Sequence, residues 1–288
     1  MEFFAKVLEV LDTSMTTPTG YGWFHLMWWA IVWASTIGLC LWHRRSGTHR
    51  RVVNVVLIVA ITVMILEVYK IINFGFSYKE GVSFSFPWGS FPWQFCSTPM
   101  YIGLLAGIIR KGKVHDALCA YLATFAIFAG AAVMVYPGDV FISTIGINIQ
   151  TMICHGSMIT VGIYLLYSGH VKLEHKTILK ALPVFVAMLC IAMIMNEVAH
   201  ANGMTGFNMF YISRHEPGHL PLYGDVQNML SCYPLELMIY IVGFTIAAYL
   251  MLLIGMGAPW VKRFLVWLFH WAKRFLAWLF RKKTKQQL

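Results

Sequence analysis

Seven long apolar runs constrain the fold of this 288-residue chain more than any other feature of its sequence. A helix crosses the hydrocarbon core of a bilayer with about 20 mainly apolar residues. The chain is 59% hydrophobic and 12% charged, roughly half the charged fraction of a soluble domain. The sequence therefore predicts an all-α polytopic bundle of seven transmembrane helices. The predicted spans are Tyr21–Trp42, Val52–Ile72, Phe91–Ile109, Leu118–Tyr136, Ile147–Tyr167, Leu179–His200 and Leu230–Met256.

Lysine and arginine collect in alternate loops between these runs. With the N-terminus outside and the C-terminus inside, all but four of the 22 cationic residues lie on the inner side, as the positive-inside rule requires. The exceptions are Lys6, Lys70, Lys79 and Arg214. This pattern predicts a multi-pass protein of a cell membrane. It also explains the net charge of +10 without nucleic acid as a partner.

The sequence divides into three parts. Residues 1–19 read as an outer amphipathic segment, residues 20–257 as the seven-span domain, and residues 258–288 as a basic C-terminal helix and tail. The last part repeats "VKRFLVWLFHW" as "AKRFLAWLFRK", and a period of eleven stacks the Lys-Arg pairs on one helix face. Such a helix is expected to lie on anionic lipid of the inner leaflet.

Gly103 and Gly107 form a GxxxG motif, which is as compatible with close packing of helices within one bundle as with a dimer. We expect a monomer.

Polar residues inside the predicted spans fall at similar depth. Ionisable groups there are costly and usually mark function. The inner halves carry no comparable group, which argues against a transport pathway open to both sides. Spacing by three predicts an ion pair between Glu67 and Lys70, and a similar pair between Glu197 and His200. The outer-half residues are His25, Glu67, Lys70, Gln94, Cys96, His155, Asn196, Glu197, His200 and Glu236.

The stretch "FPWQFCSTPMYIG" opens the third span with polar residues and a second proline. Either a helix begins at Pro92 and encloses Pro99, or it begins at Pro99 after irregular backbone at membrane depth. In both cases Cys96 lies beside a break in the helix. His155 reaches similar depth from another span, so the two side chains could act as nucleophile and base. The six cysteines fit neither a CxxC metal motif nor a disulfide framework, and most are expected to pack as small hydrophobes.

A resemblance to a known family rests on three segments. "PWQFCSTPMYI" resembles the "PLHLCSISMF" type of segment in the YwaF-like seven-span membrane proteins of bacteria, and "GFNMFYISRHEP" followed by "YPLELMIYI" is similar to two further segments of that family. The resemblance covers roughly residues 20–255. That family resembles the transmembrane protein 164 acyltransferases, which move a fatty acyl chain between phospholipids. These are related in turn to the androgen-induced-gene-type lipid hydrolases, which use a threonine and a histidine.

The resemblance implies that Cys96 is the nucleophile and His155 the base. Gln94 is a departure, because many bacterial members have histidine at this position. The leading hypothesis is an acyltransferase or lipid hydrolase that acts on phospholipid in the outer leaflet and needs no metal or cofactor. Gln94, Asn196 or Asn208 would donate to the oxyanion, and Arg214 or Lys70 would hold the lipid phosphate.

Two alternatives remain open at the level of the sequence. One is a non-enzymatic lipid-binding or transport protein in which the polar cluster binds a headgroup. The other is a metal-dependent membrane hydrolase, since histidine and carboxylate suit zinc. Its ligands would come from His25, His155, Glu197, His200 and Glu236.

Overall fold

The computed structural model describes residues 2–77, 81–138, 140–216, 220, 223–230 and 232–257. In this part of the chain, six helical segments are long and apolar enough to cross a membrane. The predicted interfacial helix of residues 258–288 lies outside the described residues. The six segments are α2 (Trp23–Ser46), α3 (His49–Gly75), α5 with α6 (Lys113–Leu122 and Phe125–Val135), α7 (Ile145–Tyr167), α8 (Lys176–Ala201) and the last span (Tyr233–Gly257).

Shorter elements join these helices. The helix α1 (Glu2–Leu11) precedes α2, and a small antiparallel hairpin of β1 (Phe76–Ser77) and β2 (Ser83–Phe84) follows α3. The remaining elements are α4 (Thr98–Ile109), α9 (Tyr223–Met229) and the 3₁₀ turns η1 (Trp88–Ser90) and η2 (Met209–Tyr211). The expectation of an all-α polytopic bundle is therefore confirmed.

The third predicted span, Phe91–Ile109, is helical only over α4. A helix of 12 residues is about 18 Å long, against about 30 Å of hydrocarbon. Pro99 lies in the first turn of α4, where a backbone N–H would have no partner within the helix, so proline costs no hydrogen bond there. Residues 91–97 form turns and bends before it. The structure therefore has the arrangement in which the helix begins near Pro99 after irregular backbone, and not the one in which it begins at Pro92.

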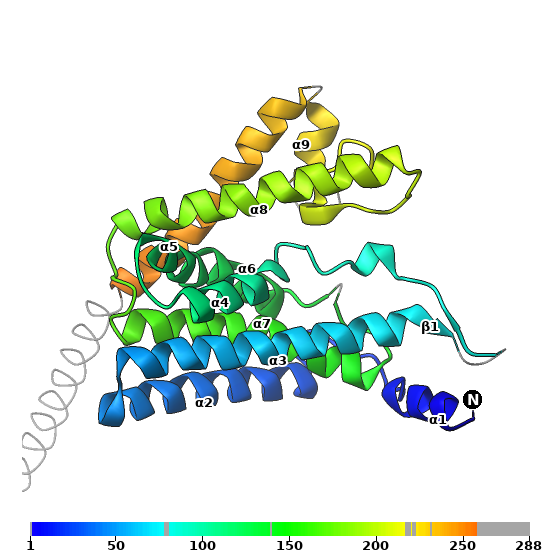
Figure 1. Cartoon of the computed structure of the whole chain (residues 1–288), viewed down its shortest axis with the longest axis horizontal. Coiled ribbons are helices and arrows are strands. Elements are labelled where there is room, and N and C mark those ends of the chain that lie inside the picture. The colour runs from blue at the N-terminus through cyan, green and yellow to red at the C-terminus, as the bar shows by residue number, and fades with distance from the viewer. Residues whose placement is uncertain are drawn as a thin grey trace, which may run out of the picture.

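The helices form three layers (Figure 1). The pair α2 and α3 lies on one side, α4 to α7 occupy the middle, and α8 covers the other side together with the last span. The two middle spans, Lys113–Val135 and Ile145–Tyr167, are the most enclosed, with 72% of their most apolar windows buried against 22–28% in the other four. A side chain from these two spans therefore meets protein on most sides.

The two ends of the bundle differ in charge. The turns that join α2 to α3, α4 to α5 and α7 to α8 carry the Arg and Lys residues between 44 and 51, 110 and 113, and 172 and 180. We call this end the basic end. The opposite end, here the loop end, holds α1, the hairpin, residues 91–97 and the segment after α8 (Figure 1).

The helix α4 approaches α3 through the two glycines of the GxxxG motif. A Cβ built on Gly103 would lie 2.9 Å from Cβ of Ala60, and one built on Gly107 would lie 2.7 Å from Cβ of Leu57. Both distances are shorter than carbon atoms tolerate, and the neighbouring Cβ atoms are fixed by the backbone of α3. The motif therefore serves packing inside the bundle, and it brings the start of α4 close to α3.

We expect Gly107→Ala to destabilise the protein by about 1–3 kcal/mol, because the new methyl group forces α4 away from α3. Thermal unfolding in detergent would measure this loss. Gly38→Ala on α2 is the matched control, since nothing lies within 4 Å of the added Cβ and alanine favours the helix. Equal unfolding temperatures for the two variants would contradict the close packing of α3 and α4.

Candidate functional site

Cys96 lies in a fixed turn just before α4. The carbonyl of Gln94 accepts from the backbone N–H of Ser97 at 2.8 Å and of Thr98 at 3.1 Å. Thr98 Oγ1 lies 2.9 Å from Tyr121 OH, which ties the turn to α5. The thiol is half-buried and forms no disulfide. The irregular backbone thus holds a free thiol at the loop end of the bundle.

His155 lies one helical turn after Thr151 on α7 and is buried. Its Nδ1 is 2.8 Å from the carbonyl oxygen of Thr151. A carbonyl only accepts, so Nδ1 carries the proton and Nε2 keeps its lone pair. Nε2 is buried and finds no hydrogen-bond partner among the described residues. The imidazole is therefore held in the tautomer of a base whose accepting nitrogen is unused.

The last turns of α3 supply charged groups that act on these two side chains. Lys70 lies close enough to act electrostatically on both Cys96 and His155. Its ammonium is 2.6 Å from a carboxylate oxygen of Glu67, which confirms the predicted ion pair. The other carboxylate oxygen accepts from Gln150 Nε2 at 3.0 Å. Glu67 is only 3% exposed, so this pair links α3 to α7 inside the bundle.

A buried loop, residues 207–213, packs beside the turn of Cys96. Phe210 and Tyr211 have φ values of 58° and 57°, a left-handed backbone that is costly for aromatic residues and persists only where the surroundings enforce it. Gln94 enforces it from one side: its Nε2 donates to the carbonyl of Asn208 at 2.9 Å, and its Oε1 accepts from the N–H of Phe210 at 2.9 Å.

The same loop is held from α8 and from within. Asn196 donates to the carbonyl of Met209 at 3.0 Å and accepts from its N–H at 2.7 Å. Asn208 Oδ1 accepts from the N–H of Ser213 at 2.9 Å. The three predicted oxyanion donors, Gln94, Asn196 and Asn208, are thus brought together, and each already holds loop backbone.

Arg214 and Glu197 meet at the exposed surface of the loop end. Arg214 Nη2 lies 2.9 Å from Glu197 Oε2, and His215 Nε2 lies 3.2 Å from the same oxygen. The ring of His200 stacks on that of His215, with centroids 3.5 Å apart. Glu197 therefore pairs with the loop after α8 instead of with His200, because that loop folds back over the end of its own helix.

His25 and Glu236 have other surroundings. His25 is fully buried, its Nδ1 accepts from the N–H of Tyr21 at 2.9 Å, and its Nε2 therefore donates to the carbonyl of Met134 at 2.8 Å. Nδ1 holds the backbone just before α2 and Nε2 joins α2 to the end of α6, which leaves neither nitrogen for a metal. Glu236 is buried near the start of the last span. The ligand set of the metal-hydrolase alternative does not gather in the described part of the chain.

A group that could hold a metal lies at the basic end instead. His115, Cys119 and His170 place one ligand atom each within 4.8 Å of one another, the only such group of His, Cys, Asp or Glu among the described residues. Burial, together with the neighbouring imidazoles of His115 and His49, lowers the pKa of His170 to about 4. The expectation that the inner halves of the spans carry no polar group comparable to those of the outer halves is therefore wrong. It no longer argues against a transport pathway open to both sides.

The predicted span boundaries explain why this group is not predicted from the sequence. His115 precedes the predicted span that begins at Leu118, and His170 follows the one that ends at Tyr167, so both fall in predicted loops. Cys119 was expected to pack as a small hydrophobe. The available signal was "HDALC", which puts a histidine and a cysteine four residues apart on one helix face.

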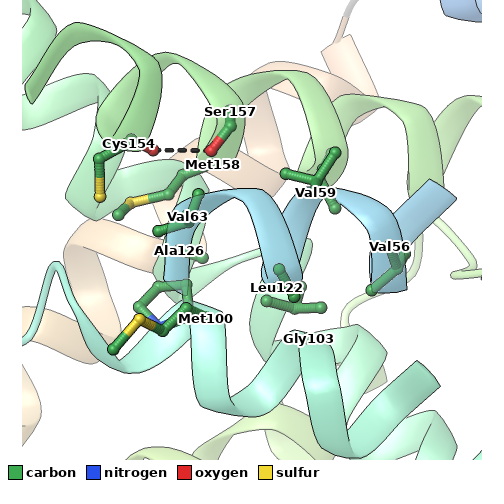
Figure 2. Close-up of a pocket in the computed structure, with 13 residues that line it drawn as sticks. Val56, Val59, Val63, Met100, Gly103, Leu122, Ala126, Cys154, Ser157 and Met158 are labelled. Carbon is green, nitrogen blue, oxygen red and sulfur yellow. Dashed lines mark hydrogen bonds between the residues drawn. The ribbon is translucent and has the colours of Figure 1, made fainter. Parts of the chain in front are cut away.

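A small apolar cavity lies between α3, α4 and α7 (Figure 2). It measures about 30 Å³, room for one or two water molecules. Met100 and Cys154 are among its lining residues, and Ser157 Oγ, also in the lining, donates to the carbonyl of Cys154 at 2.8 Å. The cavity adjoins α4 just after the turn of Cys96, and an acyl chain would enter it only after side chains move.

These features define a polytopic membrane protein with a free thiol at its loop end and a buried histidine near the middle of α7. Comparison with protein families matches the TMEM164 family over residues 20–256. The chain belongs to the TMEM164 family, as its resemblance to that group predicted. Neither the curated proteins nor the solved structures contain a match to it.

We expect Asn196→Ala to destabilise the protein by about 2–5 kcal/mol, because it leaves the N–H and C=O of Met209 buried without partners. Thermal unfolding and limited proteolysis within residues 207–213 would report the loss. Asn202→Ala, at the C-cap of the same helix, is the control, since that exposed side chain donates to the carbonyl of Val198. Similar losses in the two variants would show that Asn196 does not hold the loop.

We expect Lys70→Met to cost about 3–5 kcal/mol, because it leaves the Glu67 carboxylate buried without its counter-ion. The double variant Glu67→Gln with Lys70→Met should lose less than Lys70→Met alone. A double-mutant cycle of unfolding free energies measures this coupling. Strictly additive losses would mean that the two side chains act independently.

Proposed function

We propose that this protein is an intramembrane lipid acyltransferase or lipid hydrolase in which Cys96 is the nucleophile and His155 the base. The observation that carries the proposal is the accepting nitrogen of His155, buried and without a hydrogen-bond partner among the described residues. A buried lone pair without a partner is costly unless a donor such as a thiol or a substrate hydroxyl reaches it. The free thiol of Cys96, which like His155 lies within electrostatic reach of Lys70, and the family membership agree with this role.

The reaction would proceed through a thioester. His155 Nε2 takes the proton of the Cys96 thiol, and the sulfur attacks the ester carbonyl of a phospholipid. When the tetrahedral intermediate collapses, the C–O bond breaks and His155 returns the proton to the departing alcohol oxygen. A second hydroxyl, from an acceptor lipid or from water, gives its proton to His155 and attacks the thioester. The C–S bond then breaks, and His155 returns the proton to the departing sulfur of Cys96.

The surrounding polar groups would stabilise charge in this reaction. Gln94 uses one N–H of its amide on the carbonyl of Asn208, and the other would donate to the oxyanion, a type of contact that contributes strongly to acyl transfer. Lys70 and Arg214 supply positive charge at the loop end for a lipid phosphate. Each of the two side chains already forms an ion pair with a glutamate.

The proposed orientation places this chemistry at the outer leaflet of a cell membrane. The basic end faces the cytoplasm by the positive-inside rule, which puts the N-terminus outside. α4 together with residues 91–97 takes the place of a complete third span. A monomer provides every residue that the reaction uses, and residues 258–288 would rest on anionic lipid of the inner leaflet.

A phospholipid with an alkyne-tagged acyl chain would test the proposal, because the tag should stay on the protein as a thioester that hydroxylamine cleaves. Cys96→Ala should lose both labelling and turnover. His155→Ala should lower turnover about 10²–10⁴-fold, the usual contribution of a general base. The double variant should be no worse than Cys96→Ala alone, since the two groups act as one unit.

Two other cysteines serve as controls. Cys154 lies beside His155 in the chain and is buried, and Cys190 is exposed on α8. Cys154→Ala and Cys190→Ala should keep their label. Turnover at the wild-type rate in Cys96→Ala, or loss of label in Cys154→Ala alone, would overturn the assignment of the nucleophile.

A further inference from the structure

We propose that His115, Cys119 and His170 bind a zinc ion at the basic end of the bundle. The ligand atoms would be Nε2 of both histidines and the Sγ atom of the cysteine. These atoms lie within 4.8 Å of one another, and nitrogen with thiolate is a ligand set typical of zinc. This site is separate from the proposed acyl-transfer site, because His155 lies near the middle of α7, roughly 18 Å along the helix axis from the C-terminal end of that helix.

The backbone brings the three residues together from two turns of the chain. α4 ends at Ile109, the next residue Arg110 adopts a left-handed conformation, and Gly112 turns the chain with φ 98° into α5. His115 and Cys119 then lie one helical turn apart on the same face of α5. At the end of α7, Gly169 with φ 71° reverses the chain and places His170 against them.

His115 presents a lone pair to this group. Its Nδ1 is 3.0 Å from the carbonyl of Ala106, so Nδ1 carries the proton and Nε2 can only accept. A backbone carbonyl on the distal nitrogen is the usual way in which proteins orient a histidine that binds a metal. Both His115 and Cys119 are about 1% exposed, so water does not compete for this nitrogen.

Two donors compete for that single lone pair. His170 Nε2 lies 2.7 Å from His115 Nε2, and the thiol of Cys119 lies 3.5 Å from the same nitrogen. One nitrogen lone pair accepts one good hydrogen bond, so one of these polar groups lacks a proper partner. A cation between the three atoms resolves the conflict, because it accepts an electron pair from each of them.

Binding of the ion has a defined proton balance. His170 moves its proton from Nε2 to Nδ1, which releases a lone pair without loss of charge. Cys119 gives its thiol proton to solvent and binds as the thiolate. A zinc ion with one thiolate and two neutral imidazoles then carries a net charge of +1, which the buried site tolerates better than a free divalent ion.

His49 borders the site on its exposed side. Its ring stacks on that of His170, with centroids 4.7 Å apart, and its Nε2 lies 3.0 Å from the carbonyl of Arg110. His170 is partly exposed, so the fourth coordination position faces the surface of the basic end. Water occupies such a position in zinc sites that have three protein ligands. The ion would link the turn between α4 and α5 to the loop between α7 and α8.

Metal analysis of the purified, untagged chain tests the site. We expect about one zinc per chain, with less than a tenth of this in Cys119→Ser and in His170→Asn. Cys190→Ser and His175→Asn are the matched controls. Cys190 is exposed on α8, and His175 lies in the same loop as His170 but bonds Tyr249 OH. The controls should keep the metal.

A second measurement uses the wild-type chain alone, so it does not depend on the folding of any variant. Zinc is removed by a chelator and replaced by cobalt, whose thiolate charge-transfer band and tetrahedral ligand-field bands report the ligand set. Both bands should appear, and added zinc should abolish them and raise the unfolding temperature. The absence of zinc together with the absence of cobalt bands would overturn the proposal, and copper in place of zinc would overturn the choice of metal.

Discussion

A single constraint underlies the loop end of this protein: backbone that leaves regular helix inside a membrane bundle must still find partners for its N–H and C=O groups. Two irregular segments satisfy this constraint together. Gln94 comes from the turn of Cys96 and bonds the 207–213 loop at both Asn208 and Phe210, while Asn196 bonds Met209 from α8. The thiol is therefore fixed by the same contacts that make the loop possible.

This arrangement explains why so many amides lie near the proposed nucleophile. Amide side chains both donate and accept, so they can replace the lost hydrogen bonds of a helix without adding charge. Lys70, which is paired with Glu67, supplies a local charge that acts on both Cys96 and His155. Structural support and the proposed chemistry thus share one set of side chains, and a substitution at Gln94 would affect both.

Reactive side chains lie in two separate regions of this bundle. Cys96 lies at the loop end and His155 near the middle of α7, whereas His115, Cys119 and His170 lie at the basic end. The helix α7 connects them, since His155 lies within it and His170 follows its C-terminal turn. Because α7 is one of the two most enclosed spans, a change that moves it would reach both groups.

The sequence by itself determined the class of protein, six of the seven spans, the family and the pair Glu67–Lys70, because long apolar runs, loop charge and i, i+3 spacing are local properties. It also limited the start of the α4 helix to two positions, Pro92 or Pro99. It could not determine which groups meet. His115 and His170 are 55 positions apart, and Glu197 finds Arg214 only because a loop folds back. Such contacts arise from the packing of whole helices and the direction in which each turn leaves them, and only the tertiary structure decides these.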